Sequence, residues 1–349
     1  MPNTLTDSRP DYDAPTALKA FLEAEGLAMS KRFGQNFLVN RTARERILEA
    51  ALKVAGLEAP AADAAAPAGA GGATGAAGPG QGGAAPAGAE ALPLPGGPGR
   101  ATGRAWEIGP GIGSMTELAL DAGLRVSVFE IDHGFARLLC RLFGERPEFR
   151  LVEGDFLKTW RAELEAKGAP DFIFGNLPYN VAAAIVAVLI EGFAEAGIAP
   201  LPMAFTVQKE AALRMAARPG TEDYSAFSVL CTSACKVKLA FDVGASSFWP
   251  VPRVTSTLVT MAPRKDPIGA ADRKAFSFFC RASFSSRRKT IKNNLRAAGW
   301  ADADVAAALE KLGLSPSVRA EVLSPESLES LMLALPPRAG LANSGRGSL

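Results

Sequence analysis

Glu-Ile-Gly-Pro-Gly-Ile-Gly, residues 107–113, joins a predicted strand at 105–108 to a predicted helix at 114–122. Glycines such as Gly109 and Gly111 let the backbone approach a ligand closely and turn the chain toward a helix N-terminus. The next predicted strand ends at Glu130, where a carboxylate can accept hydrogen bonds from both ribose hydroxyls of an adenosine-containing cofactor. The loop and the acid together predict an α/β sheet that binds such a cofactor at its strand ends.

Around this loop the sequence alternates between short apolar runs and helix-like segments, which is typical of a parallel sheet with crossover helices. We predict strands at 105–108, 125–130, 149–153, 171–175 and 203–208, and helices at 114–122, 134–143, 159–166 and 181–194. A hairpin of 236–241 with 256–261 is expected to close the sheet with antiparallel strands. From about residue 263 the pattern becomes helical. There Cys280, Phe284, Ile291 and Leu295 recur at helix-like spacing, which predicts a second, small helical domain.

The tetrapeptide Asn176-Leu177-Pro178-Tyr179 follows the apolar run 171–175. This arrangement suits methyl transfer to an exocyclic amine such as that of adenine, whose lone pair is delocalised into the ring. The Asn176 side-chain oxygen and a backbone carbonyl can accept hydrogen bonds from the two amine hydrogens, which favours a pyramidal nitrogen. Tyr179 offers a face on which the base can stack. Read alone, the four residues are equally consistent with an ordinary strand-to-helix turn.

A third strand end carries Asp155, which is placed to accept a hydrogen bond from the adenine amine of the cofactor. Taken singly, Glu130 or Asp155 is equally consistent with a solvated strand end that binds no cofactor. The glycine loop also fits a nicotinamide dehydrogenase, but its GxGxG spacing and internal proline leave fewer amides for a pyrophosphate. Strand ends that carry, in order, a glycine loop, two acids and the Asn176 tetrapeptide favour methyl transfer.

Composition limits the other classes of function. The chain has 349 residues, enough for two domains, and its 38 basic and 36 acidic residues give a net charge of only +2, so any basic surface must be local. A single histidine, His133, makes a zinc site improbable, and we expect no metal. We interpret the four cysteines as reduced core thiols. No segment resembles a signal peptide or a membrane span, so we expect a soluble, cytoplasmic protein.

The sequence as a whole resembles a known family, the small-subunit (16S) ribosomal RNA adenine N6,N6-dimethyltransferases. The segments that carry the resemblance occur in the family order at compatible spacings. They are Lys31-Arg32-Phe33-Gly34-Gln35-Asn36-Phe37-Leu38, residues 107–113, Glu130, residues 153–155, 175–180 and 207–210, Phe248-Trp249-Pro250-Val251-Pro252-Arg253-Val254, and residues 287–295.

The resemblance implies a Rossmann-like class I methyltransferase sheet with an antiparallel closing hairpin, a small all-helical C-terminal domain, and S-adenosylmethionine as cofactor. It further implies that Asn176 and Leu177 hold the target amine, while Tyr179 and Phe248 stack on the extruded adenine. Pro178 belongs to the same implied catalytic set. The cofactor pocket would be lined by Asn36, Leu38, Gly109, Gly111, Glu130, Asp155 and Asn176.

The implied reaction dimethylates two adjacent adenosines near the 3′ end of 16S rRNA, within an assembling small ribosomal subunit, and we expect a monomer. We expect an N-terminal extension at 1–30, a methyltransferase domain at 31–262, a helical RNA-binding domain at 263–336 and a disordered tail at 337–349. Residues 59–103 are almost entirely alanine, glycine and proline, which predicts a flexible insertion that the family pattern lacks.

Basic residues within the predicted second domain are the main candidates for RNA contact. Arg288, Lys292 and Arg296 recur every four residues, which predicts a stripe along one helix, and Arg287 and Lys289 extend its charge. Such a run is often only a solvated helix face, but beside a predicted RNA enzyme it favours phosphate contact. Lys31 and Arg32 are further candidates near the active site. We interpret His133 as a surface or helix-start residue and residues 208–210 as structural.

Two alternatives on the same fold remain open. One is a large-subunit (23S) rRNA adenine dimethyltransferase that confers antibiotic resistance, against which Leu177 and the basic segment 287–295 favour the small-subunit enzyme. The other is a non-catalytic RNA- or DNA-binding assembly or transcription factor, which the intact cofactor and Asn176 motifs disfavour. A dehydrogenase is the most distant alternative, since no residue suggests a hydride-site acid.

Overall fold

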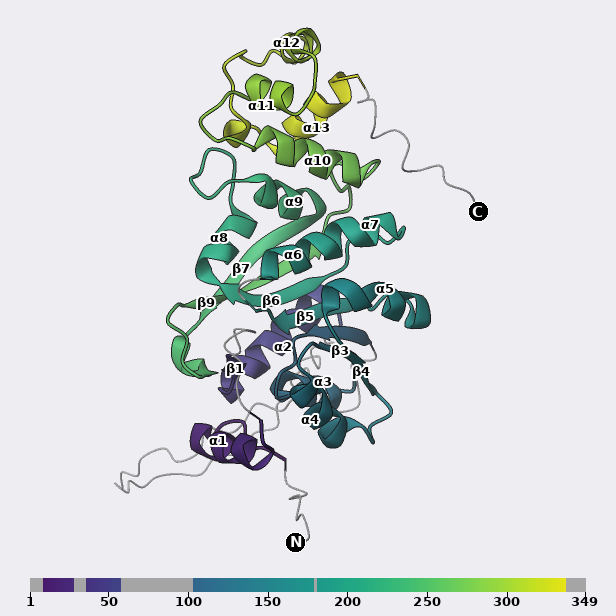
Figure 1. Ribbon diagram of the computed structural model, residues 1–349, viewed down its shortest axis with the longest axis vertical. Helices are drawn as coiled ribbons and strands as arrows, with labels where there is room; N and C mark the ends of the chain where they lie inside the picture. The colour runs from purple at the N-terminus through teal and green to yellow at the C-terminus, as the bar shows by residue number, and fades with distance from the viewer. Residues whose placement is uncertain (1–8, 28–35, 58–102, 179–180, 337–349) are drawn as a thin grey trace, which may run out of the picture.

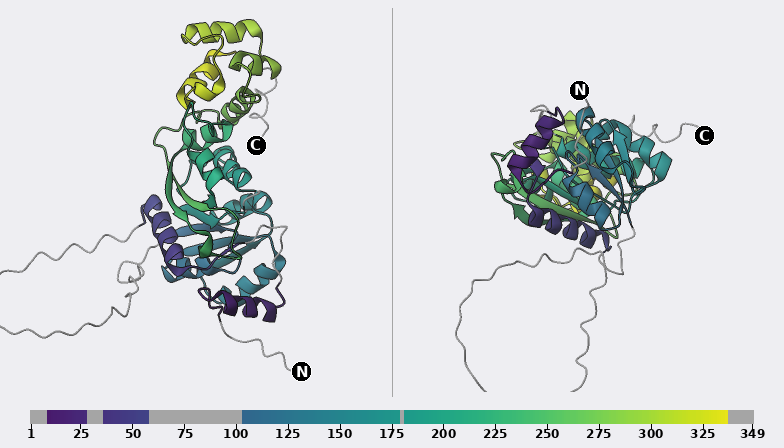
Figure 2. Two further views of the ribbon diagram at one scale, coloured as in Figure 1. Left: turned by 90° about the vertical axis from the view of Figure 1, so that its left-hand side faces the viewer. Right: turned by 90° about the horizontal axis from the view of Figure 1, so that it is seen from below.

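The computed structural model describes residues 9–27, 36–57, 103–178 and 181–336. Figure 1 shows an elongated molecule with a layered α/β part below and a group of helices above, and Figure 2 shows the same division from the side. The predicted insertion at 59–103, apart from Gly103, and the predicted tail at 337–349 lie outside the described residues. The division into domains at residues 30, 262 and 336 stays a prediction.

One mixed sheet forms the centre of the lower part. Within the described residues its seven strands run in the order β4-β3-β2-β5-β6-β9-β7. Strands β4, β3, β2, β5 and β6 are parallel, and β9 pairs antiparallel with β6 and β7, which confirms the predicted closing hairpin. The strands are β2 (Arg104–Ile108), β3 (Arg125–Glu130), β4 (Phe149–Glu153), β5 (Phe172–Asn176), β6 (Met203–Gln208), β7 (Cys235–Val243) and β9 (Ser256–Pro263).

The strand order reverses beside β2, because the chain proceeds outward to β4 and then returns to β5 on the other side of β2. The carboxyl ends of the five parallel strands therefore meet at one edge, and ligands of such sheets bind at the reversal point. Side chains alternate between the two faces, so Phe172 and Phe174 pack into one apolar cluster and Ile173 into the other. All three are fully buried, as a sheet covered on both faces requires.

Helices cover both faces of the sheet. The apolar cluster that contains Phe172 and Phe174 packs one face of the sheet against a first group of helices. The cluster that contains Ile173 packs the other face against a second group. The first group is α2 (Arg41–Ala55), α3 (Ser114–Asp121) and α4 (His133–Phe143). The second group is α5 (Phe156–Lys167), α6 (Ala182–Ala187), η2 (Val188–Gly192), α7 (Phe193–Glu195), α8 (Lys209–Ala216) and α9 (Ala226–Ala234). The predicted helix at 181–194 thus contains a π-helical turn, η2, which the sequence did not indicate.

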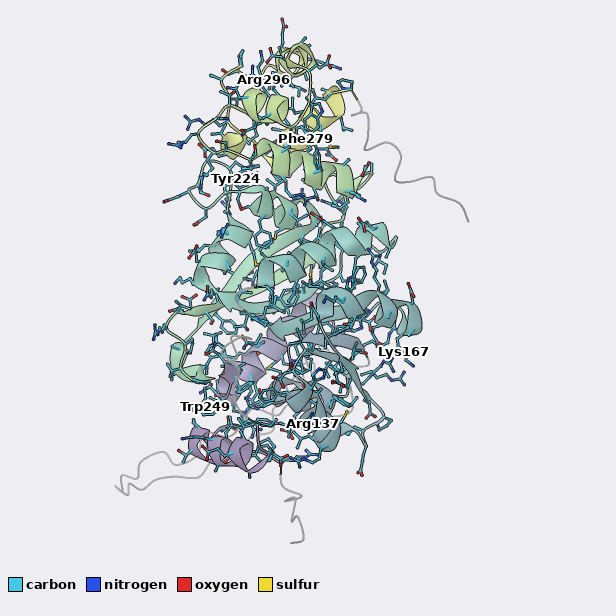
Figure 3. All side chains as sticks on the ribbon, in the orientation of Figure 1. Arg137, Lys167, Tyr224, Trp249, Phe279 and Arg296 are labelled. Atoms are coloured by element: carbon cyan, nitrogen blue, oxygen red, sulfur yellow. The ribbon has the colours of Figure 1, made fainter. Side chains whose placement is uncertain are left out.

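Four helices and a short turn form the upper part: α10 (Arg273–Ser283), α11 (Ile291–Ala297), α12 (Asp302–Lys311), η4 (Ala320–Val322) and α13 (Pro325–Ala334). Their shared core includes Phe276, Phe279 and Leu328, and the buried Tyr224 donates a hydrogen bond of 2.9 Å to the Leu323 carbonyl. Figure 3 shows Tyr224 where this group meets the sheet part.

The prediction of a single basic stripe on one helix is wrong. Helix α10 ends at Ser283, and Thr290 caps a new helix, α11, by accepting a hydrogen bond of 3.3 Å from the Asn293 amide. Arg288 lies in the turn between the two helices, so it does not share a helix face with Lys292 and Arg296. The turn itself presents Arg287, Arg288 and Lys289 to solvent.

A second sheet of two short strands joins segments that lie far apart in the sequence. Strand β1 (Phe37–Leu38) pairs antiparallel with β8 (Phe248–Trp249), and η3 (Ala245–Ser247) precedes β8. The register sets Phe37 opposite Trp249 and Leu38 opposite Phe248, and the Ser247 carbonyl accepts from the Val39 amide at 2.8 Å. Two of the motifs that carry the family resemblance therefore contact each other directly.

The N-terminal segment packs against the sheet part rather than extending from it. Helix α1 (Pro15–Ala24) buries Leu18 and Leu22 in a cluster with Phe37, Ile112 and Phe135. Figure 1 shows α1 at the lower end beside β1 and α4, and Figure 3 shows Trp249 close to it. No sequence pattern indicated that this segment packs beneath the glycine loop.

Candidate active site

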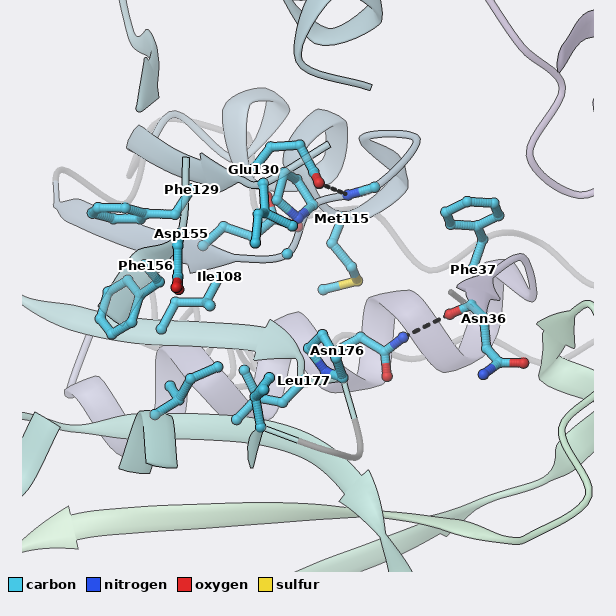
Figure 4. Close-up of a pocket in the computed structure, with 18 of the residues that line it drawn as sticks. Asn36, Phe37, Ile108, Met115, Phe129, Glu130, Asp155, Phe156, Asn176 and Leu177 are labelled. Atoms are coloured by element: carbon cyan, nitrogen blue, oxygen red, sulfur yellow. Dashed lines mark hydrogen bonds between the residues drawn. The ribbon is translucent and has the colours of Figure 1, made fainter. Parts of the chain in front are cut away.

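A cavity of about 190 Å³ opens at the carboxyl edge of the parallel strands, at the point where the strand order reverses. Its walls come from Asn36 and strand β1, from the glycine loop and the start of α3, from the ends of β3, β4 and β5, and from the starts of α5 and α6. Figure 4 shows Glu130 and Asp155 along one side and Asn36 and Asn176 along another, with Met115 between them. The cavity brings together the predicted candidates Asn36, Leu38, Gly109, Gly111, Glu130, Asp155, Asn176, Leu177 and Pro178.

The glycine loop needs glycine for two physical reasons. Gly109, Gly111 and Gly113 have φ angles of 72°, 56° and 82°, in the left-handed region that side-chain-bearing residues rarely adopt. In addition, a Cβ on Gly111 would lie 2.8 Å from the ring of Phe37, whereas one on Gly109 would have its nearest neighbours, the Asn176 carbonyl oxygen and Pro178, 3.8 Å away. The loop thus packs tightly on β1 at Gly111 and less tightly at Gly109, which lines the cavity.

Glu130 is held in place by the glycine loop. Its Oε2 accepts a hydrogen bond from the Gly111 amide at 3.1 Å, and its Oε1 accepts from the Asp132 amide at 2.9 Å. Burial raises the pKa of the Glu130 carboxyl to about 7, and the backbone donors partly oppose this shift. Each carboxylate oxygen retains acceptor capacity beyond these bonds, which suits it to a pair of ribose hydroxyls.

Glu107 is a site residue that the sequence did not single out, although it directly precedes the glycines. It lines the cavity with only 2% of its surface exposed, and its Oε2 accepts a hydrogen bond of 2.6 Å from the Thr116 hydroxyl. Burial raises the pKa of the Glu107 carboxyl to about 8. An acid before a glycine loop was the available signal, but its burial depends on α3 packing over the strand.

The two raised pKa values make stability depend on pH in a definite direction. Between pH 4.5 and about 8 the folded protein binds more protons at Glu107 and Glu130 than the unfolded chain does. The contribution of these two carboxyls to the free energy of unfolding should therefore be fully present below pH 4.5 and be lost as the pH rises through 7 and 8. We expect Glu107→Gln to flatten this fall in thermal melts recorded from pH 5 to 8. Parallel curves for variant and wild type would contradict the assignment.

Asn176 ends β5 with its amide oriented by a backbone contact. Its Nδ2 donates a hydrogen bond of 2.8 Å to the Asn36 carbonyl, which fixes the nitrogen on that side of the amide. The other amide atom, Oδ1, is buried and has no hydrogen-bond partner among the described residues. Figure 4 shows this amide at the cavity wall. An unsatisfied buried acceptor is costly, so this oxygen is suited to a ligand that donates a hydrogen bond.

The residues after Asn176 fix the backbone around this acceptor. The Leu177 amide donates a hydrogen bond of 3.0 Å to the Thr206 carbonyl of β6. The Pro178 carbonyl is occupied, because it accepts from the Val181 and Ala182 amides at 3.1 Å as α6 begins. The Leu177 carbonyl is therefore the better candidate for the second acceptor that was predicted beside the Asn176 oxygen.

Asp155 combines a structural contact with a place on the cavity wall. As the N-cap of α5, it accepts a hydrogen bond of 3.0 Å from the Leu157 amide through Oδ1. This cap orients the carboxylate at the end of β4, and its Oδ2 remains for a ligand. Its predicted contact with an adenine amine is consistent with this position and stays a prediction.

Several predicted site residues lie elsewhere. Phe248 is 1% exposed and packs in the core across from Leu38, and it does not line the cavity. A stacking role for Phe248 stays a prediction, and it would require the ring to leave this core position. Lys31, Arg32 and Tyr179 lie outside the described residues.

The basic candidates differ in how far their charge is already neutralised. Arg287 forms an ion pair of 3.3 Å with Glu321, and Lys292 forms one of 2.8 Å with Asp302. Arg288 and Lys289 are exposed and form no ion pair with any described residue. These two side chains are thus the better candidates for an external anion.

The remaining expectations concern metals, membranes and thiols. Among the described residues, no group of three or more His, Cys, Asp or Glu side chains is placed to hold a metal ion. No helix in the same part of the chain is long and apolar enough to cross a membrane.

Cys231, Cys235 and Cys280 are buried free thiols as predicted, but Cys140 is exposed on α4, so the prediction that all four are core residues is wrong. His133 begins α4 and pairs with Glu153, as expected for a helix-start residue.

Comparison with solved structures supports the fold. A dimethyladenosine transferase from Plasmodium falciparum superposes with a TM-score of 0.54 at 24% identity, over 66% of this chain and 89% of that one. The 23S rRNA methyltransferase ErmE superposes with a TM-score of 0.52 at 22% identity, over 86% of this chain and 99% of that one. The likeness confirms the predicted class I methyltransferase fold.

Comparison with sequences identifies the family. A family model described as "Ribosomal RNA adenine dimethylase" matches residues 102–335, more than half of the chain. A Treponema denticola protein named "Ribosomal RNA small subunit methyltransferase A" is 39% identical over 323 residues, 91% of this chain and 93% of its own. A Synechococcus protein of the same name is 39% identical over 249 residues, 70% of this chain and 86% of its own. With its fold, its cavity and these matches taken together, the chain belongs to the ribosomal RNA adenine dimethylase family.

Proposed function

We propose that this protein transfers methyl groups from S-adenosylmethionine to N6 of two adjacent adenosines near the 3′ end of 16S rRNA, giving N6,N6-dimethyladenosine. The observation that carries the proposal is the buried, unpartnered Oδ1 of Asn176 at the wall of the strand-end cavity. The choice of small-subunit RNA is supported by the relatives from Treponema denticola and Synechococcus, which are named small subunit methyltransferases.

The residues at the cavity fit this cofactor. Glu130 and Asp155 supply carboxylates for the ribose and adenine ends, and Ile108 and Phe129 supply apolar wall. Gly109 brings the loop backbone to the cavity without a side chain. Bound S-adenosylmethionine supplies an electrophilic methyl group on a sulfonium, with a neutral thioether as leaving group. The protein then has only to bind the cofactor, exclude water and orient the amine.

Asn176 performs the orienting step. Its Oδ1 accepts a hydrogen from the adenine amine, and the Leu177 carbonyl accepts the other, so the nitrogen becomes pyramidal and its lone pair is freed for attack. The amide does not rotate away, because its Nδ2 is tied to the Asn36 carbonyl at 2.8 Å. No general base is needed before attack, since the proton leaves after the new bond has formed.

The base must leave its stack to reach this acceptor, at a cost of a few kcal/mol that stacking on an aromatic side chain offsets. We assign that face to Tyr179, which follows Pro178 in the chain, and keep Phe248 as a second candidate because of its buried position. Lys31 and Arg32 lie a few residues before Asn36 in the sequence, and they remain candidates for RNA contact.

The turn between α10 and α11 provides a test of RNA binding. We expect Arg288→Ala/Lys289→Ala to weaken binding of small-subunit rRNA and to reduce the slope of log affinity against log salt by about 1.4, for two phosphate contacts. The control is Arg287→Ala/Lys292→Ala, whose cations already pair with Glu321 and Asp302 and should contribute less. Equal losses in both double variants, measured by filter binding at several salt concentrations, would contradict the assignment.

The experiment that tests the function is transfer of labelled methyl to small ribosomal subunits that lack the modification, with large subunits as control. Dimethyladenosine in the small-subunit RNA is expected. Label only in the large subunit would favour the 23S enzyme, and no label in either would favour a non-catalytic assembly or transcription factor. An assembling subunit as the natural substrate, a monomeric state and a cytoplasmic location are further parts of the proposal.

A further inference from the structure

Arg44 on α2 is a buried cation with an unusual partner. Its side chain is 4% exposed, and its Nη2 forms an ion pair of 2.7 Å with Asp13, which precedes α1. Asp13 is the one acidic side chain within ion-pair distance of Arg44 among the described residues. A buried charge is tolerated only when it is paired, so the position of Arg44 depends on the N-terminal segment.

The other terminal guanidinium nitrogen of Arg44 contacts a residue that lines the cavity. Its Nη1 donates a hydrogen bond of 3.3 Å to the carbonyl of Ser114, the first residue of α3 after the glycine loop. The Ser114 hydroxyl in turn donates to the Leu38 carbonyl at 2.9 Å. Because Ser114 and Leu38 both line the cavity, Arg44 connects Asp13 to two parts of the cavity wall.

Two neighbours of Asp13 contact the same region independently. The Tyr12 hydroxyl donates a hydrogen bond of 3.3 Å to the carbonyl of Ile112, inside the glycine loop. Tyr12 is 5% exposed, and the Arg44 guanidinium lies 5.3 Å from the centre of its ring. Arg9 forms an ion pair of 3.0 Å with Glu117, in the first turn of α3. The N-terminal segment therefore contacts the loop and the helix start from behind the cavity.

Helix α1 completes this contact with apolar side chains. Leu18 and Leu22 pack with Ile112 of the loop and with Phe37, whose ring also lies against Gly111. Phe37 meets Phe135 of α4 edge-on, with ring centroids 5.2 Å apart. The left view of Figure 2 shows α1 beneath the sheet part. The side of the loop opposite the cavity is thus covered by residues that precede β1.

We propose that residues 9–27, here called the N-terminal clamp, hold the glycine loop in its cofactor-binding geometry, and that Asp13, acting through Arg44, is a positioning residue for cofactor binding. The loop has three glycines with positive φ, so it has little conformational preference of its own. Fixing it before the cofactor arrives lowers the entropy cost of binding. The inference rests on the proposed function, because it assumes that the cavity takes S-adenosylmethionine.

The test compares two neutralising variants of the same segment in the full-length chain. Asp13→Asn removes the partner of the buried Arg44. Glu25→Gln removes an ion pair of equal length, 2.7 Å, between α1 and Arg141 of α4, which does not touch the loop. For each variant we would measure S-adenosylhomocysteine affinity by calorimetry, melting temperature, and hydrogen exchange of the Gly111 and Gly113 amides without ligand.

Asp13→Asn should weaken S-adenosylhomocysteine binding about tenfold and speed exchange of both loop amides, because an unpaired buried cation displaces the Ser114 contact. Glu25→Gln should change affinity and exchange by less than about twofold. In the Arg44→Met background, Asp13→Asn should have no further effect on affinity, since no cation is left unpaired.

Unchanged affinity and exchange in Asp13→Asn would overturn the positioning role of Asp13. Equal effects in Asp13→Asn and Glu25→Gln would overturn it as well, because the pair with Arg44 would then act no differently from an ion pair that does not reach the loop. A wild-type protein that fails to bind S-adenosylhomocysteine would instead overturn the proposed function. In that case the exchange of the two loop amides still decides whether Asp13 positions the loop.

Discussion

Asn176→Ala should lower the rate of methyl transfer by about 10²–10³-fold or more, which in a standard assay amounts to abolishing activity. The variant removes the one side-chain acceptor, Oδ1, that is buried at the cavity wall without a partner among the described residues. Cofactor binding should remain largely intact, because the carboxylates of Glu130 and Asp155 are unchanged. Single-turnover transfer to unmodified small subunits measures the first effect, and calorimetry with S-adenosylhomocysteine measures the second.

The alanine variant also loses the bond from Nδ2 to the Asn36 carbonyl, so a second variant is needed to separate the two contacts. Asn176→Asp keeps an acceptor at the cavity but replaces the donor with a carboxylate oxygen that faces the Asn36 carbonyl. It should therefore retain more activity than Asn176→Ala if the acceptor matters most. Turnover within tenfold of wild type in Asn176→Ala would show that Oδ1 does not orient the amine.

Glu130→Ala should weaken cofactor binding by about 10²-fold or more. A hydrogen bond to a charged group contributes about 1.5–3 kcal/mol, and two ribose hydroxyls would be left without an acceptor, at about tenfold per 1.4 kcal/mol. The variant also releases the Gly111 and Asp132 amides that the carboxylate now holds at 3.1 and 2.9 Å. At saturating cofactor, kcat should change much less than KM for the cofactor, which steady-state kinetics would show.

Glu153→Ala is the matched control for this experiment. Glu153 also ends a parallel strand, β4, but it pairs with His133 and does not line the cavity. Its replacement should leave cofactor affinity within about twofold of wild type. Similar losses in the two variants would mean that the effect of Glu130→Ala comes from strand-end charge in general rather than from a direct contact.

The sheet and most of the cavity could be predicted because they depend on local patterns. Strands at 125–130, 149–153 and 203–208 were predicted with the bounds that β3, β4 and β6 have, since each is an apolar run between polar turns. The candidate residues of the cavity stand at strand ends, and the parallel topology then brings them to one edge. One local rule thus predicted the sheet and the strand-end residues of the site, whereas Asn36 and Leu38 were assigned by the family resemblance.

The features that were missed depend on contacts between distant segments. Strands β1 and β8 have two residues each, too few to show any period. The pairing of Asp13 with the buried Arg44 has no sequence signal, because each residue alone reads as a surface charge. The break between α10 and α11 was hidden for another reason. Phe284 and Ile291 are seven residues apart, close to two helical turns, so the apolar spacing continues across a gap that only the capping Thr290 marks.

The position of β9 in the sheet has a consequence for synthesis of the protein. Strand β9 (Ser256–Pro263) is the last strand of the sheet in the chain, yet it lies between β6 and β7 and pairs with both. When the glycine loop, Glu130 and Asn176 have emerged from the ribosome, the nascent chain therefore still lacks β9, the inner strand that joins β7 to the sheet. Strand β8, which backs β1 at the cavity, also emerges late. The sheet that supports the cofactor cavity is complete only after about three quarters of the chain has left the ribosome that makes it, and this late, long-range pairing is expected to slow folding.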